Sequence, residues 1–252
     1  MDNSPSNIIF NRTERLLGAE VMSRLADTRV IILGIGGVGS WTAEALARTG
    51  VGHLTIVDAD SVSPTNINRQ AEANLQTVGE IKVDAMRRML LSYSDDIDVV
   101  AVAKEYNEDT ADEFDLESFD YVVDAIDSLA AKALLIRRAT TARHPRLVSS
   151  MGAALKLDPT RIAVAEFWKV EGCPLAAALR RRFKKSGDMP RRKFKCVYSP
   201  ELLSNKGVAS DDDPAMSYNK VAVNGSLCHI TAIFGMTLAG LVINDIVSQT
   251  PK

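Results

Sequence analysis

A glycine-rich segment after the first predicted strand limits the folds open to this chain. Residues 30–33 form an apolar run that predicts a buried strand, and residues 40–49 predict a helix. In such a turn, one glycine permits a tight bend, a second lets the backbone approach a phosphate, and a third lets helix and strand pack closely. The helix start then offers N–H groups to an anion. The pattern predicts a nucleotide site, and its glycines are Gly34, Gly36, Gly37 and Gly39.

An acidic residue follows the second predicted strand at a matching distance. Residues 53–57 predict that strand, and it ends at Asp58, about twenty residues after the glycines. A carboxylate in this position can hydrogen-bond a ribose hydroxyl. The alternatives are an ordinary strand-to-helix turn and an acid that caps a turn. We favour the nucleotide site because strand, glycines, helix and acid fall in register.

Predicted strands and helices alternate through the first 150 residues. This alternation indicates a Rossmann-like, doubly wound and mostly parallel α/β sheet. After a turn at 157–160, the pattern favours a C-terminal antiparallel extension. Further strands are predicted at 97–103, 120–124, 146–149, 161–167 and 196–199. Further helices are predicted at 14–27, 79–91, 129–142 and 173–183, with acidic, weakly helical 108–117 and a polar mobile loop at 205–220.

A chain of 252 residues can form one large α/β domain, or one domain with an appendage. We expect a nucleotide-binding domain at 1–152. Residues 153–252 form an extension within the same globule. No C-x-x-C pair is present, which excludes a four-cysteine zinc site.

The apolar segment 221–247 predicts a long C-terminal helix. Polar residues interrupt its ends, and the uninterrupted stretch is near the lower limit for crossing a bilayer. A buried core helix is therefore favoured, and membrane association through 230–247 is the alternative. Three widely spaced cysteines and a polar N-terminus predict a reducing, cytoplasmic location.

Two basic residues and an aspartate separate ATP from NAD as the expected ligand. Arg69 and Lys82 can hold a polyphosphate, since a guanidinium forks onto phosphate oxygens and an ammonium acts as a point charge. Asp127, with Asp124 as a further candidate, follows a predicted strand and can hold Mg²⁺ against the phosphates. A dehydrogenase does not need two cations and a metal-binding carboxylate around a phosphate chain. A dehydrogenase and a non-catalytic scaffold are therefore disfavoured.

The combination resembles the ubiquitin-activating-enzyme-like adenylating proteins over residues 10–152. It consists of G-x-G-G-x-G, D-x-D, N-x-x-R-Q, a lysine and D-x-x-D. The resemblance implies that Asp58 binds ribose and that Asp127 lies beside Mg²⁺. It implies a set of phosphate-binding residues. It also implies a homodimer in which Arg12 reaches the ATP of the other subunit. That phosphate-binding set is Asn66, Arg69 and Lys82, with Gln70 beside them.

Finer features are similar to the bacterial tRNA threonylcarbamoyladenosine dehydratase branch of this family. They are residues 34–41, 43–48, 124–128 and 196–201, with Lys132. The branch implies ATP-dependent cyclisation of threonylcarbamoyladenosine next to the tRNA anticodon, by activation of its carboxylate as an adenylate. The alternative is adenylation of the C-terminus of a ubiquitin-like sulfur-carrier protein. A sulfur-transfer partner and an additional monovalent cation stay open.

Two further features have competing interpretations. Cys196 is a candidate reactive thiol, since later cysteines of relatives react, or a plain buried cysteine. The basic run at 180–195 is either a solvated face or a tRNA phosphate site. We favour tRNA, because charge this clustered on a chain of net charge −2 marks a local site, and the same net charge gives no general attraction for DNA. The basic residues are Arg180, Arg181, Arg182, Lys184, Lys185, Arg191, Arg192, Lys193 and Lys195.

Overall fold

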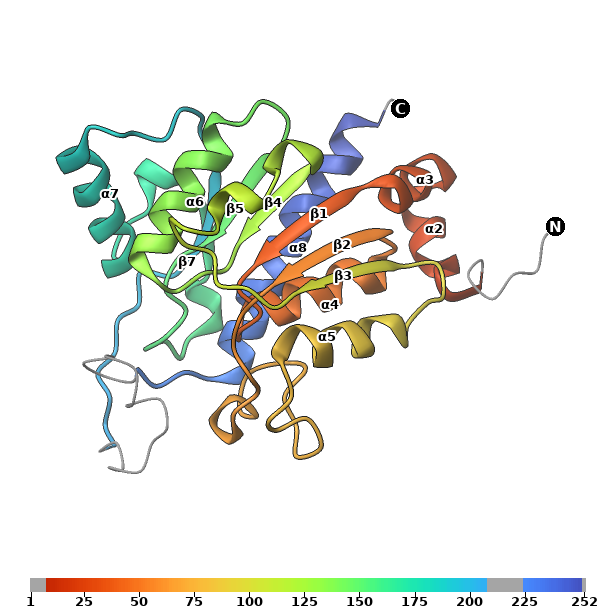
Figure 1. The fold of residues 1–252 in the computed structure, drawn as a ribbon, viewed down its shortest axis with the longest axis horizontal. Coiled ribbons are helices and arrows are strands. Elements are labelled where there is room, and N and C mark those ends of the chain that lie inside the picture. Colours follow the sequence, from red (N-terminus) through yellow and green to blue (C-terminus); the bar gives the residue numbers. More distant parts are fainter. Residues whose placement is uncertain (1–7, 208–223, 251–252) are drawn as a thin grey trace.

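A seven-stranded sheet forms the centre of the molecule (Figure 1). The computed structural model describes residues 8–207 and 224–250. Along the sheet the strands follow the order β3-β2-β1-β4-β5-β7-β6. In chain order they are β1 (Arg29–Leu33), β2 (His53–Val57), β3 (Asp98–Val102), β4 (Tyr121–Asp124), β5 (Arg146–Ser150), β6 (Ala163–Glu166) and β7 (Lys195–Tyr198).

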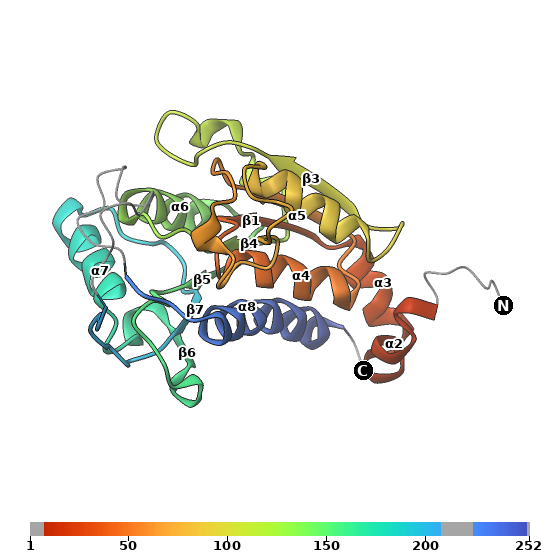
Figure 2. The same cartoon turned by 90° about the horizontal axis from the view of Figure 1, so that it is seen from below.

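Helices cover both faces of the sheet, as Figure 2 shows from below. One face carries α3, α4, α5 and α8, and the other carries α6 and α7. Alternate residues of β1 belong to the two cores: Ile32 packs with the first group and Ile31 with the second. This double burial explains the unbroken apolar run at 30–33. The helices are α2 (Asn11–Leu17), α3 (Ala19–Asp27), α4 (Gly39–Thr49), α5 (Lys82–Leu91), α6 (Leu129–Thr141), α7 (Pro174–Ser186) and α8 (Cys228–Gln249).

The strand pairing confirms the predicted fold class. The pairs from β3 through β7 are all parallel, and β6 alone runs antiparallel, against β7. The chain order reverses between β1 and β4, and open α/β sheets bind ligands at the carboxyl ends of strands at such a point. Residues 153–252 add β6 and β7 to the same sheet, and the boundary at 152 stays a prediction.

Helix α8 lies against α4, directly beneath the glycine segment. A Cβ on Gly235 would lie 2.5 Å from the carbonyl oxygen of Val38, so only glycine permits this approach. The Thr42 hydroxyl lies within donating distance of two carbonyls, that of Val38 at 3.0 Å and that of Gly235 at 3.1 Å. Phe234 and Leu238 are fully buried in the same core. Among the described residues, α8 alone has the length and composition to cross a membrane, and 44% of its most apolar window is buried within the protein.

Three predicted elements were wrong in detail. The helix expected at 14–27 is two helices, because Gly18 adopts a φ of +84° and ends α2. The helix expected to start at 79 begins at Lys82, after a turn at Gly79. The acidic segment at 108–117 contains only two short 3₁₀ turns, Ala111–Glu113 and Leu116–Ser118. Most of the predicted loop at 205–220 lies outside the described residues.

Candidate nucleotide site

The glycine segment makes a turn that side chains would block. Gly34 has a φ of +91°, and a Cβ there would lie 2.7 Å from the carbonyl oxygen of Ala125, beyond β4. A Cβ on Gly39 would lie 1.8 Å from the carbonyl oxygen of Gly34. Both positions therefore require glycine, as the motif predicts. The turn brings the end of β1, the start of α4 and the end of β4 together at the carboxyl edge of the sheet.

The other two glycines face the segment that carries Arg69 and Gln70. A Cβ on Gly36 would have the Gln70 amide nitrogen nearest, at 3.8 Å, and one on Gly37 would lie 3.2 Å from Arg69 Cγ. Helix α4 anchors this segment, because the Trp41 indole N–H donates to the carbonyl of Arg69 at 2.9 Å. The glycine turn and the polar segment are thus neighbours, although thirty residues of chain separate them.

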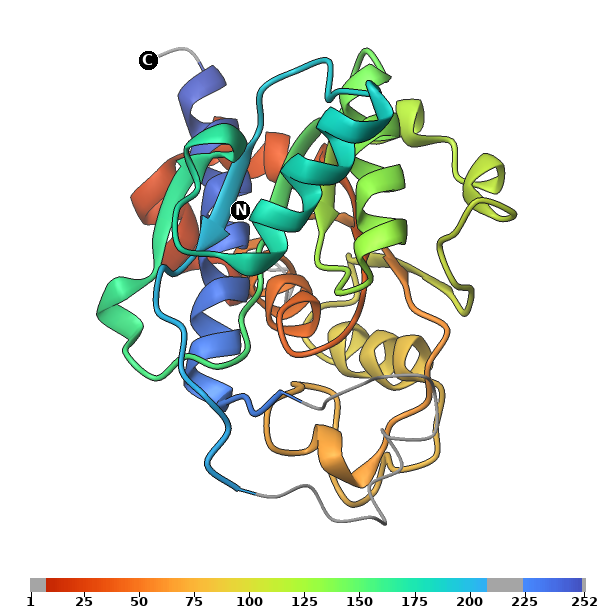
Figure 3. The same ribbon diagram turned by 90° about the vertical axis from the view of Figure 1, so that its left-hand side faces the viewer.

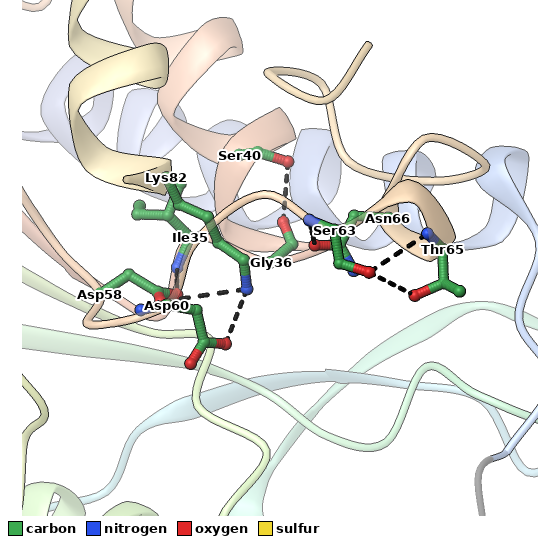
Figure 4. A network of polar contacts seen from close by, with 9 residues as sticks. All are labelled: Ile35, Gly36, Ser40, Asp58, Asp60, Ser63, Thr65, Asn66 and Lys82. Atoms are coloured by element: carbon green, nitrogen blue, oxygen red, sulfur yellow. Dashed lines mark hydrogen bonds and ion pairs between the residues drawn. The ribbon is translucent and has the colours of Figure 1, made fainter. Parts of the chain in front are cut away.

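Asp58 follows β2 and points back at the glycine turn (Figure 4). Its Oδ2 accepts from the Ile35 N–H at 2.7 Å, and its Oδ1 accepts from the Asp60 N–H at 2.9 Å. Burial raises the pKa of Asp58 above its ordinary value, with Lys82 and the two N–H groups acting in the opposite direction. The carboxylate is therefore held rigidly next to the turn.

Lys82 is the first residue of α5 and is 5% exposed. Its ammonium lies 2.8 Å from Asp60 Oδ2 and 4.0 Å from Asp58 Oδ1 (Figure 4). The Asp60 side chain is 73% exposed, so one partner of this ion pair is in solvent. A lysine held in this way can exchange a surface carboxylate for a phosphate without leaving a buried charge unpaired.

Asn66, Arg69 and Gln70 lie on the turn that starts with the 3₁₀ helix Pro64–Asn66. The Asn66 side chain accepts from the Ser63 N–H at 3.0 Å and completes a capping box. The Arg69 guanidinium donates to the carbonyl of Thr65 at 2.9 Å. The Gln70 side chain is buried, and its oxygen has no hydrogen-bond partner within the described residues. The turn therefore fixes the direction of the Arg69 guanidinium. The Gln70 side-chain oxygen is an unused hydrogen-bond acceptor.

The two aspartates after β4 are in different surroundings. Asp124 is fully buried, accepting from Lys132 at 2.8 Å and from the Ser149 hydroxyl at 2.6 Å. It therefore belongs to the core and not to a metal site. Asp127 is exposed, three residues further on. No cluster of three metal-ligating side chains occurs among residues 8–207 and 224–250. A single carboxylate suits Mg²⁺, which takes its other ligands from substrate phosphates and water.

The sequence matches a known protein family over almost its whole length. The family model described as "ThiF family" matches residues 10–251. This chain belongs to the ThiF family. The tRNA threonylcarbamoyladenosine dehydratase of Bacillus subtilis (strain 168) is 35% identical over 244 residues, 95% of each chain. That of Escherichia coli (strain K12) is 40% identical over 199 residues, 77% of this chain and 74% of the relative.

A solved structure extends the similarity to the fold. It is the E. coli tRNA N6-threonylcarbamoyladenosine dehydratase TcdA in complex with ATP. That structure has a TM-score of 0.85 to this ThiF-family chain at 33% sequence identity, covering 99% of this chain and 98% of the other. The likeness therefore includes the extension after residue 152 as well as the sheet.

Arg12 lies far from the candidate nucleotide site of its own chain. It is in α2, and Phe10, just before α2, lies at the C-terminal end of α4 beside Gly50. The glycine turn is at the other end of α4, roughly 16 Å away for an eleven-residue helix. Any contact between Arg12 and ATP would therefore have to be made with another subunit.

The structure favours the plain interpretation of Cys196. This cysteine lies in β7 with no exposed surface, and burial raises the pKa of its thiol well above the ordinary value. Only the thiolate is a strong nucleophile, so Cys196 in this structure is an inert core residue.

Two members of the predicted basic surface have structural partners. Arg180 donates to the carbonyls of Phe167 and Val170 at 3.1 and 2.9 Å. Arg192 donates to four carbonyls after and within the last turn of α6, at 2.8 to 3.1 Å. These two guanidiniums stabilise the fold of the ThiF-family chain. The other members are exposed on α7 (teal in Figure 3) and on the segment that enters β7: Arg181, Arg182, Lys184, Lys185, Arg191, Lys193 and Lys195.

Sequence reasoning missed three residues that shape this ThiF-family site. Asp60 was visible in the D-x-D pattern, but nothing in the sequence identified it as the partner of Lys82. Trp41 holds the Arg69 segment on α4, and Glu72 is buried next to Lys82. No local pattern distinguishes these residues, because their roles depend on contacts between separate elements.

Proposed function

We propose that this ThiF-family protein is an ATP-dependent tRNA threonylcarbamoyladenosine dehydratase, which cyclises that nucleoside next to the anticodon. The similarity to the B. subtilis dehydratase over 95% of both chains carries this assignment. The glycine turn, Asp58 and Lys82 at the carboxyl edge of the sheet support it, because ATP activation needs a phosphate cradle and a cation.

The reaction removes one water in two steps. A carboxylate oxygen of the threonyl group attacks the α-phosphorus of ATP, and diphosphate leaves, forming an acyl-adenylate. A nitrogen of the same side chain then attacks the acyl carbon, loses its proton, and expels AMP, which carries away the carboxylate oxygen. No protein nucleophile is needed, which agrees with the buried state of Cys196.

The protein supplies alignment and charge stabilisation. We assign the glycine turn to the phosphates, Asp58 to the ribose, and Arg69 and Lys82 to the charge that develops on the departing diphosphate. Asn66 supports the turn that carries Arg69, and Gln70 lies beside them with an unused acceptor. Mg²⁺ would be held by Asp127 and would neutralise phosphate charge when bound.

The proposal includes a homodimer, tRNA contacts and a cytoplasmic location. Arg12 would enter the site of the partner subunit, and a two-fold axis would then give two equivalent sites. The exposed lysines and arginines of α7 and of the segment before β7 would bind tRNA phosphates. Burial of the inner face of α8 supports a core helix over a membrane contact.

The second candidate is adenylation of a sulfur carrier's C-terminus. It uses the same ATP site and differs in the acceptor. The full-length similarity to dehydratases and the basic residues of α7 favour an RNA acceptor over this alternative.

One assay separates the two candidates. The protein is incubated with ATP, Mg²⁺ and threonylcarbamoylated tRNA, and the digested nucleosides are analysed by mass spectrometry. We expect the nucleoside to lose the mass of one water only when ATP is present. Hydrolysis of ATP without that mass change would reject the dehydratase and leave the sulfur-carrier candidate.

A further inference from the structure

A buried carboxyl group with no role in the proposed reaction lies beside the nucleotide site. Glu72 is 2% exposed, and both of its side-chain oxygens lack a hydrogen-bond partner within the described residues. The backbone around it is anchored, because the Ala71 N–H donates to the Ser40 hydroxyl and the Thr77 hydroxyl donates to the carbonyl of Glu72. The side chain therefore has no simple route to solvent.

The groups around Glu72 explain why its oxygens are unpaired. The Ser40 hydroxyl on α4 is close, but its single proton goes to the carbonyl of Gly36 at 2.7 Å. Lys82 on α5 interacts with Glu72 electrostatically, but its ammonium is bonded to Asp60 at 2.8 Å. Asp58, after β2, adds a repulsive negative charge.

An unpaired carboxylate in such a place is costly, so the neutral acid is favoured. Burial raises the pKa of Glu72 to about 7, and its own backbone, Lys82 and Ser40 have smaller opposing effects. The group is therefore divided between its two protonation states near neutral pH. In the ionised state, Glu72 adds a third negative charge to the field at the Lys82 ammonium, which is already paired with Asp58 and Asp60.

We propose that Glu72 is a positioning residue that takes up one proton when ATP binds. The proton removes a buried negative charge next to the incoming phosphates, and Lys82 then turns from Asp60 to the phosphates without facing a competing carboxylate. This inference rests on the proposed ATP site.

Proton uptake by Glu72 makes the affinity for ATP depend on pH. Bound phosphate raises the pKa of Glu72 further, so the complex holds more protons than the free protein. The affinity for ATP therefore falls as pH rises above 7. For a free pKa near 7 and full protonation in the complex, the dissociation constant rises about eightfold between pH 6.5 and pH 8.

Isothermal titration calorimetry of the full chain tests whether Glu72 takes up a proton when ATP binds. A non-hydrolysable ATP analogue with Mg²⁺ is bound at pH 7.5 in buffers of different ionisation enthalpy, which gives the number of protons taken up. We expect the wild type to take up roughly 0.8 proton more than the Glu72→Gln variant. Glu72→Gln should also bind several-fold more tightly than wild type at pH 8 and equally well at pH 6. Glu44→Gln, which alters a carboxylate on α4 paired with Arg48, is the matched control and should keep the wild-type uptake.

The outcomes separate the inference from the proposed function. Binding with equal proton uptake in wild type and Glu72→Gln would overturn the role of Glu72 and leave the ATP site intact. A complete lack of analogue binding by a folded wild type would overturn the ATP site itself. If Glu72→Gln does not fold, an infrared difference spectrum of the wild type decides, because analogue binding must increase the protonated-carboxyl band.

Discussion

Two lysine–aspartate pairs stand at the carboxyl edge of the sheet with the same separation and opposite surroundings. The distance from Nζ to Oδ is 2.8 Å in both Lys82–Asp60 and Lys132–Asp124. In the second pair neither side chain has exposed surface, while the Asp60 side chain is 73% exposed. Distance alone therefore does not say what an ion pair does.

The difference lies in what each pair can exchange. Asp124 also accepts from the Ser149 hydroxyl and the Ile126 N–H, so the pair joins α6, β4 and β5 in a closed network. Breaking it would leave a charge in the core. Lys82 shares its ammonium with a carboxylate in water, which loses little when a phosphate takes its place. We call Lys132–Asp124 the closed pair and Lys82–Asp60 the open pair. The closed pair supports the site, and the lysine of the open pair can bind a phosphate.

The closed pair predicts the largest effect. Lys132→Met should lower the free energy of unfolding by about 3–5 kcal/mol, because it leaves the Asp124 carboxylate buried and uncompensated. Urea unfolding followed by circular dichroism measures this. Adding Asp124→Asn, which removes the charge, should restore part of the loss. Equal stability of Lys132→Met and wild type would show that the pair does not hold the core.

The open pair predicts a loss of activity without a loss of fold. Lys82→Ala should lower kcat by about 10²–10³-fold, the usual cost of removing one group that stabilises transition-state charge. The unfolding free energy should fall by less than in Lys132→Met, since the Asp60 carboxylate is in solvent and loses little when its partner is removed. Nucleoside mass analysis and urea unfolding check the two parts. Asp60→Asn is the control, and it should keep most of the activity.

Unlike the two paired aspartates, the buried Glu72 carboxyl group has no hydrogen-bond partner among the described residues. Its folded-state pKa of about 7 exceeds the ordinary 4.5, so the folded protein binds more protons between pH 4.5 and 7. The unfolding free energy therefore falls as pH rises through that window, by up to about 3 kcal/mol from this group. Glu72→Gln lacks this titration. It should gain stability relative to wild type from pH 4.5 to pH 8, as measured by urea unfolding at both values, and a constant difference would contradict the burial effect.

Exposed charges on α7 should have the smallest effect and act only on tRNA. Lys184→Glu with Lys185→Glu should weaken tRNA binding about tenfold at moderate salt and reduce its salt dependence. Filter binding at several salt concentrations measures both. Arg88→Glu with Lys104→Glu makes the same change in net charge elsewhere on the molecule and should have little effect. Equal weakening by the two double variants would mean that α7 carries no specific contact.

Strand ends explain which parts of the site could be predicted. Asp58 and Asp127 each follow a buried apolar run, and parallel strands bring such residues to one edge. The four glycines were identifiable from their spacing after the first strand, and Lys82 from its place after the N-x-x-R-Q motif. The mostly parallel sheet and its antiparallel end followed from the order of strands and helices.

Long-range partners explain what could not be predicted. Asp58, Asp60 and Asp124 look alike in sequence, and only the packing of α6 buries one of them with Lys132. Arg180 and Arg192 look like their basic neighbours, but backbone carbonyls of distant segments occupy their guanidiniums. Local periodicity carries no information on such contacts.

The hydrogen bond between Thr42 and Gly235 joins residues 193 positions apart. During synthesis, the glycine turn and α4 leave the ribosome long before α8 is made. Until α8 arrives, the apolar surface of α4 that packs against Phe234 and Leu238 stays uncovered, a state prone to aggregation. The newly made chain therefore gains a properly supported candidate nucleotide site only late in translation, and the slow step in its maturation should be the docking of its last helix.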